Sequence, residues 1–160
     1  IGGLELALNM NATSVDHLEV LKEEQIDLFT MSDTTAVLLP GVSFFLDYDF
    51  APARKLIDSN TIVALASDYN PGSSHISNFQ LILSLAALKM KMTIEEILSA
   101  VTINAAKALD VSESTGSIEI GKNADFSIYD ALDYSELVYN VGKNLNVMTV
   151  KNGEVVYEKK

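Results

Sequence analysis

Short apolar strands that alternate with helical segments constrain the fold of this chain more than any other feature. Residues 12–18, 36–39 and 61–66 have the composition of strands, and the last two runs are almost continuously apolar. Residues 19–29 and 51–59, which lie between them, have the pattern of helices. Strands that are apolar on both faces and are separated by helices form parallel sheets, so the sequence predicts an α/β fold.

The chain length limits how large this sheet can be. A complete eight-stranded (β/α)8 barrel needs about 250 residues, whereas the chain has 160. Three strands therefore form either a small open sheet or one part of a larger barrel. Because Ile1 is not a start methionine and the first residues do not have the pattern of a signal peptide, we expect a fragment or a processed chain.

Two further helices are predicted after the third strand, over residues 77–90, with Ser77 as N-cap, and over residues 93–109. From residue 116 on, the pattern changes from helices to strands and turns. Short strand-like stretches such as residues 117–120 alternate with turns, and Asn152-Gly153 predicts a hairpin.

Charge supports the same division. Residues 1–115 carry 6 basic and 15 acidic side chains, whereas residues 116–160 carry 5 basic and 7 acidic side chains. We therefore predict one domain over residues 1–115 and part of a second over residues 116–160.

Composition excludes several functions. The net charge of −11 argues against nucleic acid and anionic membranes as partners, because both would repel this chain. Without cysteine there is no disulfide, thiolate zinc site or thiol nucleophile. With only two histidines, an imidazole-rich metal site needs ligands from elsewhere. No apolar run reaches the roughly 18 residues of a membrane span.

Two polar residues follow predicted strands and are candidates for chemistry. Asp68 comes after residues 61–66 and could bind a metal or move a proton, or it could be a turn or cap residue. His17 ends the first strand and could donate to a substrate carbonyl, ligate a metal or act as acid or base. A histidine that is merely hydrogen-bonded at a strand end is the alternative. Because carboxyl ends of parallel strands meet at one face, the pair is more informative than either residue alone.

The loop after Asp68 has the composition of an anion site or of an ordinary turn. Gly72 and its neighbours leave backbone amides free for a carboxylate, and Asn70 can both donate and accept hydrogen bonds. Ser73 follows them, and His75 is interpreted as a solvated loop residue. The residues alone favour a simple Asn-Pro-Gly turn.

Other conspicuous residues are interpreted as structural. Arg54 is expected on a helix surface and Phe44-Phe45 in packing contacts. The acidic residues of the first helical segment are expected to form a solvated face: Glu19, Glu23, Glu24 and Asp27.

Several stretches closely resemble the imidazolonepropionase family of the amidohydrolase superfamily. They are ALASDYNPGSS, LLPGVSFFL, PARKLID and the long segment from NFQLILSL to AAKAL. GSIEIGKNADFSIYD and MTVKNGEVVYE resemble the superfamily's small β domain, and nearly the whole chain is covered. The resemblance implies the C-terminal part of a (β/α)8 amidohydrolase barrel, followed by strands of a small β-sandwich domain that both chain ends build.

The resemblance also implies an activity. Members of that family are cytoplasmic hydrolases that use one Zn or Fe ion. With water they open the ring of 4-imidazolone-5-propanoate to N-formimidoyl-L-glutamate, in histidine degradation. By this resemblance Asp68 is the metal-binding and catalytic aspartate, and His17 is the catalytic histidine that contacts the substrate. Asn70, Gly72 and Ser73 then bind the substrate or product.

Part of the family's machinery is absent from this sequence. The His-x-His pair, a further histidine and the arginine that binds the propionate group are expected upstream of Ile1, and the family loop often has proline where His75 stands. The resemblance thus implies the C-terminal two-fifths of an enzyme, inactive alone. Its expected partners are the missing N-terminal part, a small-molecule substrate and further copies in a homo-oligomer.

Two alternatives remain open from the sequence. Another amidohydrolase, such as a deaminase or a different cyclic amidase, would share Asp68, His17 and the β domain. A non-catalytic α/β scaffold domain would use the Pro-Gly loops only as connections.

Overall fold

A computed structural model describes residues 2–160 of the chain, and Ile1 lies outside the described residues. Within this range the strands, in chain order, are β1 (Ser14–Asp16), β2 (Thr35–Leu38), β3 (Val63–Leu65), β4 (Phe126–Tyr129), β5 (Asn146–Lys151) and β6 (Glu154–Glu158). The helices are α1 (Gly3–Asn9), α2 (Glu23–Ile26), the 3-10 helix η1 (Asp27–Met31), α3 (Pro40–Leu46), α4 (Ala53–Asp58), α5 (Phe79–Met90), α6 (Ile94–Ala100), α7 (Ile103–Ala108) and α8 (Glu136–Tyr139).

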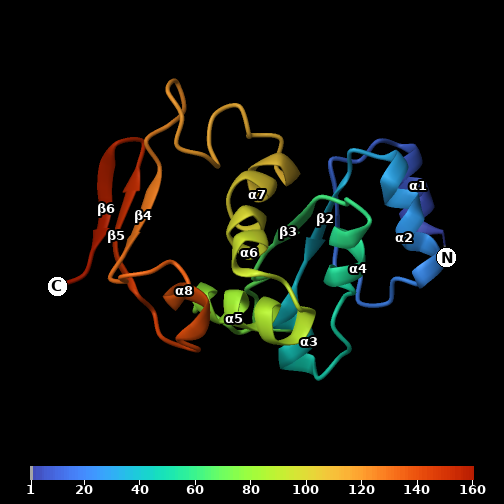
Figure 1. Cartoon of the computed structure of the whole chain (residues 1–160), viewed down its shortest axis with the longest axis horizontal. Helices are drawn as coiled ribbons and strands as arrows, with labels where there is room; N and C mark the ends of the chain where they lie inside the picture. The colour runs from blue at the N-terminus through green and yellow to red at the C-terminus, as the bar shows by residue number, and fades with distance from the viewer. Residues whose placement is uncertain (1) are drawn as a thin grey trace.

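The molecule is elongated, with its two sheets in different parts (Figure 1). The first sheet and the helices α3 to α7 form the middle, α1 and α2 lie at one end, and the second sheet lies at the other. The two termini are therefore at opposite ends of the molecule.

The first sheet confirms the predicted parallel arrangement. Its order is β1-β2-β3, and both strand pairs are parallel. Ala36 lies opposite Val63 and Leu38 opposite Leu65, and these four side chains join the main core cluster with residues of α4, α5 and α6. Because the strands run in one direction, their carboxyl ends form one edge of the sheet.

Pro40 and Gly41 end the apolar run of β2 as predicted, but they also begin a helix that the sequence analysis missed. Proline suits the first turn of a helix because its missing N–H has no intrahelical partner there, and α3 starts at Pro40. The expectation that Phe44 and Phe45 pack is wrong for the described residues, since they are 53% and 48% exposed.

The helical region after β3 differs from prediction in its boundaries. The N-cap of α5 is Asn78, whose side chain accepts a hydrogen bond from the Gln80 amide, and not Ser77. The single helix expected over residues 93–109 is divided into α6 and α7, while the capping box of Thr93 is confirmed.

Arg54 has the structural role that was expected of it. Its guanidinium donates to both carboxylate oxygens of Glu96, at 2.8 and 2.9 Å, and also to Asp58. The hydrogen bonds from Arg54 lower the pKa of Glu96 below its usual value. This pair ties α4 to the first turn of α6, since Glu96 also accepts from the Thr93 amide.

The second sheet is antiparallel, with the order β4-β5-β6. The hairpin at Asn152-Gly153 is confirmed, and both residues have the positive φ that such a turn needs. Residues 117–120, which were expected to be strand-like, are not part of either sheet. No helix within residues 2–160 is long and apolar enough to cross a bilayer.

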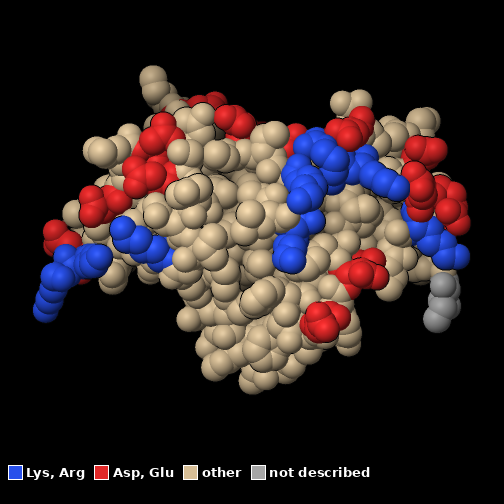
Figure 2. All heavy atoms as spheres, turned by 60° about the horizontal axis from the view of Figure 1, so that its bottom comes forward, with Lys and Arg blue, Asp and Glu red and all other residues tan. Residues whose placement is uncertain are grey.

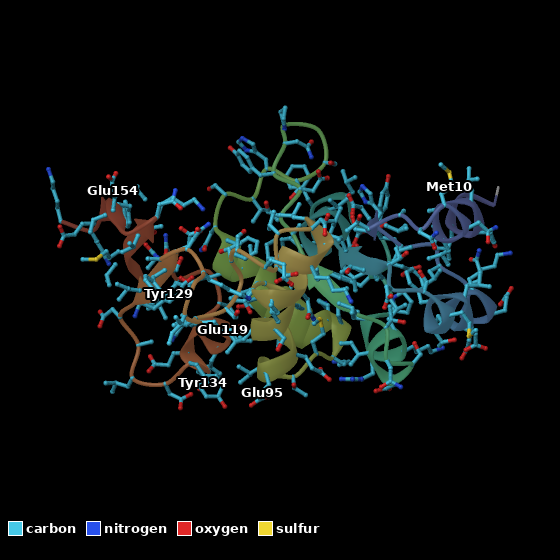
Figure 3. The ribbon with its side chains drawn as sticks, turned by 90° about the horizontal axis from the view of Figure 1, so that it is seen from above. Met10, Glu95, Glu119, Tyr129, Tyr134 and Glu154 are labelled. Atoms are coloured by element: carbon cyan, nitrogen blue, oxygen red, sulfur yellow. The ribbon has the colours of Figure 1, made fainter. Side chains whose placement is uncertain are left out.

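The segment between β4 and β5 returns to the middle of the molecule. Leu137, Val138 and Leu145 are buried in the same core cluster as the first sheet, and the Ser84 hydroxyl of α5 donates to the Val138 carbonyl at 2.7 Å. Tyr134 and Glu95, which are labelled close together in Figure 3, form a further hydrogen bond of 3.0 Å. These contacts attach the second sheet to the helices of the first.

Replacement of Ile97 tests the core. Its side chain is fully buried in α6, so Ile97→Ala should lower the free energy of unfolding by about 2–5 kcal/mol through lost burial and the cavity left behind. Ile118→Ala is the matched control, because Ile118 is 85% exposed and its loss should cost no more than about 0.5 kcal/mol. Urea denaturation of both variants measures the difference, and equal losses would contradict this core.

Candidate functional site

The predicted site residues follow the strands of the first sheet at its carboxyl edge. His17 comes directly after β1, and Asp68 lies three residues after the end of β3. Between them, α3 begins two residues after the end of β2. The structure therefore places His17 and Asp68 at the same edge of the sheet, on either side of the β2–α3 connection.

The backbone at these strand ends has an unusual conformation. His17, Leu18 and Asp68 have φ angles of 76°, 74° and 47°. A bulky residue such as leucine rarely adopts positive φ, and such strained positions concentrate at functional sites because the surrounding structure must hold them in place. This observation is independent of the side chains that suggested the site.

Asn70 organises the loop that carries Asp68. Its side-chain nitrogen donates to the Asp68 carbonyl at 2.6 Å and to the Ser73 hydroxyl at 2.8 Å. Its side-chain oxygen accepts from the amides of Gly72 and Ser73, both at 2.8 Å. The loop therefore forms an Asx-type turn, in which a side-chain oxygen binds amides two and three residues further on.

The Asp68 carboxylate is half-buried and held on one side. The Ser73 hydroxyl donates to its Oδ2 atom at 3.3 Å. Within residues 2–160 no hydrogen-bond or ion-pair partner is found for the other oxygen, Oδ1. The carboxylate can thus accept a proton or a cation through Oδ1 without losing the bond from Ser73.

A tight contact seats this loop against the first turn of α3. Ser74 is fully buried, and its hydroxyl donates to the Ser67 carbonyl at 2.8 Å. A Cβ atom added at Gly41 would lie 2.9 Å from the Ser74 hydroxyl and 2.9 Å from the tip of Ile82. Sequence reasoning missed both Gly41 and Ser74. No local signal marked this contact, because Gly41 stands in the first turn of α3 and Ser74 lies far from it along the chain.

The two histidines have different surroundings. His17 lies 3.4 Å from Glu19 through its Nδ1 atom and is 51% exposed. His75 stacks on Tyr69 with 5.4 Å between ring centroids, and the Tyr69 hydroxyl lies 3.3 Å from its Nε2 atom. His75 is exposed, in agreement with its interpretation as a loop residue. The structure thus directs His75 toward Tyr69 and leaves His17 accessible at the sheet edge.

The loop that carries Asp68 projects from the body of the molecule, as the green segment leading into α5 shows in Figure 3. The face brought forward in Figure 2 includes a broad area in the lower middle of the view that is free of Lys, Arg, Asp and Glu. Two hollows of about 240 and 190 Å³ lie elsewhere, against residues at the start of the strands such as Thr61, Val63 and Thr34. Neither hollow includes His17 or Asp68.

The described residues supply only part of a metal site. Asp68 and His17 are chemically suited to a divalent ion of the zinc or iron type. Within residues 2–160, however, no group of three or more His, Asp or Glu side chains could hold an ion. Any closed site at this edge therefore requires donors that are not among the described residues.

Comparison with known proteins identifies the class. Residues 3–156 match the model of the Amidohydrolase family. The chain therefore belongs to the amidohydrolase family. Solved structures with the same fold include a zinc-bound adenosine deaminase from Xanthomonas campestris, at TM-score 0.81 and 24% identity over 89% of this chain and 36% of that one. A zinc complex of atrazine chlorohydrolase from Arthrobacter aurescens gives TM-score 0.78 and 21% identity, over 92% of this chain and 37% of that one.

Two relatives of higher sequence identity are imidazolonepropionases. The chain is 49% identical to an imidazolonepropionase from Caldanaerobacter subterraneus, over 96% of this chain and 38% of the relative. It is 42% identical to an imidazolonepropionase from Fusobacterium nucleatum, over 99% of this chain and 38% of the relative. The chain thus spans about 38% of the length of these curated relatives.

The contact between α3 and the loop is testable by substitution at Gly41. Gly41→Ala forces a methyl group against Ser74 and Ile82, so it should lower the free energy of unfolding by about 1–3 kcal/mol. Gly3→Ala is the matched control, because nothing lies within 4 Å of an added Cβ there. Chemical denaturation of the two variants gives the comparison, and an unchanged Gly41 variant would show that the loop is not seated on α3.

Proposed function

We propose that this chain is the C-terminal part of a metal-dependent hydrolase that opens the ring of 4-imidazolone-5-propanoate with water, giving N-formimidoyl-L-glutamate. The observation that carries the proposal is the Asp68 carboxylate at the end of β3, held by Ser73 through one oxygen with the other free. The relatives at 42% and 49% identity, both imidazolonepropionases, select this reaction among those of the family.

The architecture supports the proposal. We assign β1, β2 and β3 to the last three strands of a distorted (β/α)8 barrel, and β4, β5 and β6 to a small β-sandwich. We keep the proposed domains at residues 1–115 and 116–160. Within the second domain, residues 131–145 cross back and pack on α5 of the first. The outer edges of β1 and β3 pair with no strand of the described residues, as expected of strands whose neighbours lie in a missing N-terminal part.

Asp68 would hold one Zn or Fe ion together with donors from that N-terminal part. The described residues fit such an ion only in part. Oδ1 of Asp68 is available to it, but these residues include no complete ligand set. When bound, such an ion supplies Lewis-acid polarisation of the lactam carbonyl and activation of water.

The chain's own residues then carry proton transfer and charge stabilisation. Asp68 takes a proton from the attacking water and delivers it to the ring nitrogen as the C–N bond breaks. His17, exposed at the same edge, donates to the carbonyl oxygen as negative charge develops there. In this proposal Gly72 and Ser73 border the substrate, although the Gly72 amide already donates to Asn70.

Substitution of Asp68 tests the proposal in the longer metal-loaded protein. Asp68→Ala removes both the ligand and the proton carrier, so ring opening should fall below detection. Absorbance of 4-imidazolone-5-propanoate measures turnover, and metal analysis of the same sample reports occupancy. Normal activity in this variant would remove Asp68 from the mechanism.

His17→Ala separates the roles of the two residues. Because His17 acts on the carbonyl oxygen, its loss should lower kcat by about 100-fold or more while metal content stays unchanged. Glu19→Gln is a control that alters the neighbour of His17 but leaves the imidazole in place. Loss of metal from the His17 variant would instead make His17 a ligand.

The 160-residue chain alone should neither retain metal nor open the ring. One aspartate and one histidine are fewer than the three or four protein ligands that a zinc site usually needs. Metal content after dialysis, and absorbance with the substrate, measure the two properties. Turnover by the isolated chain would contradict the proposal that its ligand set is completed by other residues.

A further inference from the structure

We infer that Glu19 is a positioning residue for His17: its carboxylate holds the Nδ1 atom of the imidazole, so that Nε2 is the nitrogen left for a substrate. The inference deepens the proposed function and rests on the role proposed there for His17. It gives a task to a side chain that the sequence analysis placed on a solvated helix face.

The first observation is the burial of Glu19. Its side chain is only 14% exposed, whereas that of Glu23, in α2, is 77% exposed and pairs with Lys55. The expectation of a solvated face is therefore wrong for Glu19. A carboxylate is rarely withdrawn from water unless a partner compensates for the lost hydration.

The second observation is that one oxygen of this carboxylate lacks a hydrogen bond. The Oε1 atom of Glu19 is buried, and no hydrogen-bond partner for it is found within residues 2–160. The Nδ1 atom of His17 lies 3.4 Å from this oxygen, slightly beyond the length of a well-formed N–H···O hydrogen bond. Hydrogen bonds of reactive side chains often shorten only when a substrate binds. A proton on Nδ1 is thus the donor that Oε1 needs.

The backbone between the two side chains keeps them together. His17 and Leu18 have φ angles of 76° and 74°, a left-handed conformation that costs non-glycine residues free energy. Leu18 packs against the main core cluster, and its carbonyl accepts from the Leu21 amide at 3.1 Å. These contacts oppose relaxation of the backbone after β1, so Glu19 stays beside the ring of His17.

The pair decides which imidazole nitrogen is available for chemistry. A neutral imidazole has one N–H donor and one acceptor nitrogen, and the hydrogen bond at one nitrogen fixes the state of the other. With Nδ1 held by Glu19, Nε2 is left for a ligand. For His17 to donate to a carbonyl oxygen, as proposed, the ring must therefore carry protons on both nitrogens, Nδ1–H for Glu19 and Nε2–H for the substrate.

The tautomer of His17, which needs no metal ion to be measured, tests the inference. NMR of the chain with 15N-labelled histidine, at about pH 9 where imidazoles are neutral, reports which ring nitrogen is protonated. We expect His17 to carry its proton on Nδ1, whereas an unconstrained imidazole carries it mainly on Nε2. His75 is the only other histidine of the chain, and His75→Gln assigns the signals.

Substitutions at Glu19 separate positioning from packing. Glu19→Ala removes the acceptor, so the proton of His17 should move mainly to Nε2. Glu19→Gln keeps a side-chain oxygen that can accept from Nδ1, and it should retain the Nδ1–H tautomer. Glu23→Ala is the matched control, because it removes an exposed carboxylate that pairs with Lys55, and it should leave the His17 signals unchanged.

Two results would overturn the inference: an Nε2–H tautomer of His17 in the unsubstituted protein, or an Nδ1–H tautomer that persists in Glu19→Ala. If the 160-residue chain does not fold alone, the same spectra of the longer protein decide the matter, with the His17 signals assigned by their loss in His17→Gln. The proposed function fails separately, because a metal-loaded longer protein that does not open the ring of 4-imidazolone-5-propanoate contradicts the reaction and leaves the tautomer result standing.

Discussion

Parallel pairing of β2 with both of its neighbours is the interaction on which the rest of this structure depends. The register sets Val15 opposite Ala36 and Leu38 opposite Leu65, so the strands end together and the polar residues that follow them share one edge. The apolar face of the same strands packs on α5 and α4, which fixes where that edge lies. A shift of one residue in either pair would turn the core side chains to the opposite face of the sheet.

The sequence allowed prediction of those features that depend on local pattern. The alternation of apolar strands with helices, the capping box at Thr93 and the Asn152-Gly153 hairpin are short-range signals, and the structure confirms them. The helix α3 was missed because Pro40-Gly41 was taken only as an end to the strand, although proline is also favoured in a first helical turn. The break between α6 and α7 left no proline or glycine to mark it.

For the candidate site, sequence reasoning identified residue types but not their interactions. Asp68 and His17 could be selected because each follows a predicted strand, and the resemblance gave each a role. The contact of Gly41 with Ser74 joins residues far apart in the chain, so no local pattern could have indicated it. The internal bonding of Asn70 was hidden for another reason: an Asn-Pro-Gly turn and a ligand-binding loop have the same composition, and only the hydrogen bonds distinguish them.

The structure also shows how this chain holds the Asp68 side chain, the ligand of the proposed metal site, in a defined orientation. Six side-chain hydrogen bonds within residues 67–74 hold the Asp68 loop, and the loop rests on α3 of the same chain. These hydrogen bonds involve no residue outside the loop itself. Because sites work best when their ligands are held before binding, this local bonding would, in the proposed metal site, set the orientation of Asp68 separately from the assembly of the other ligands.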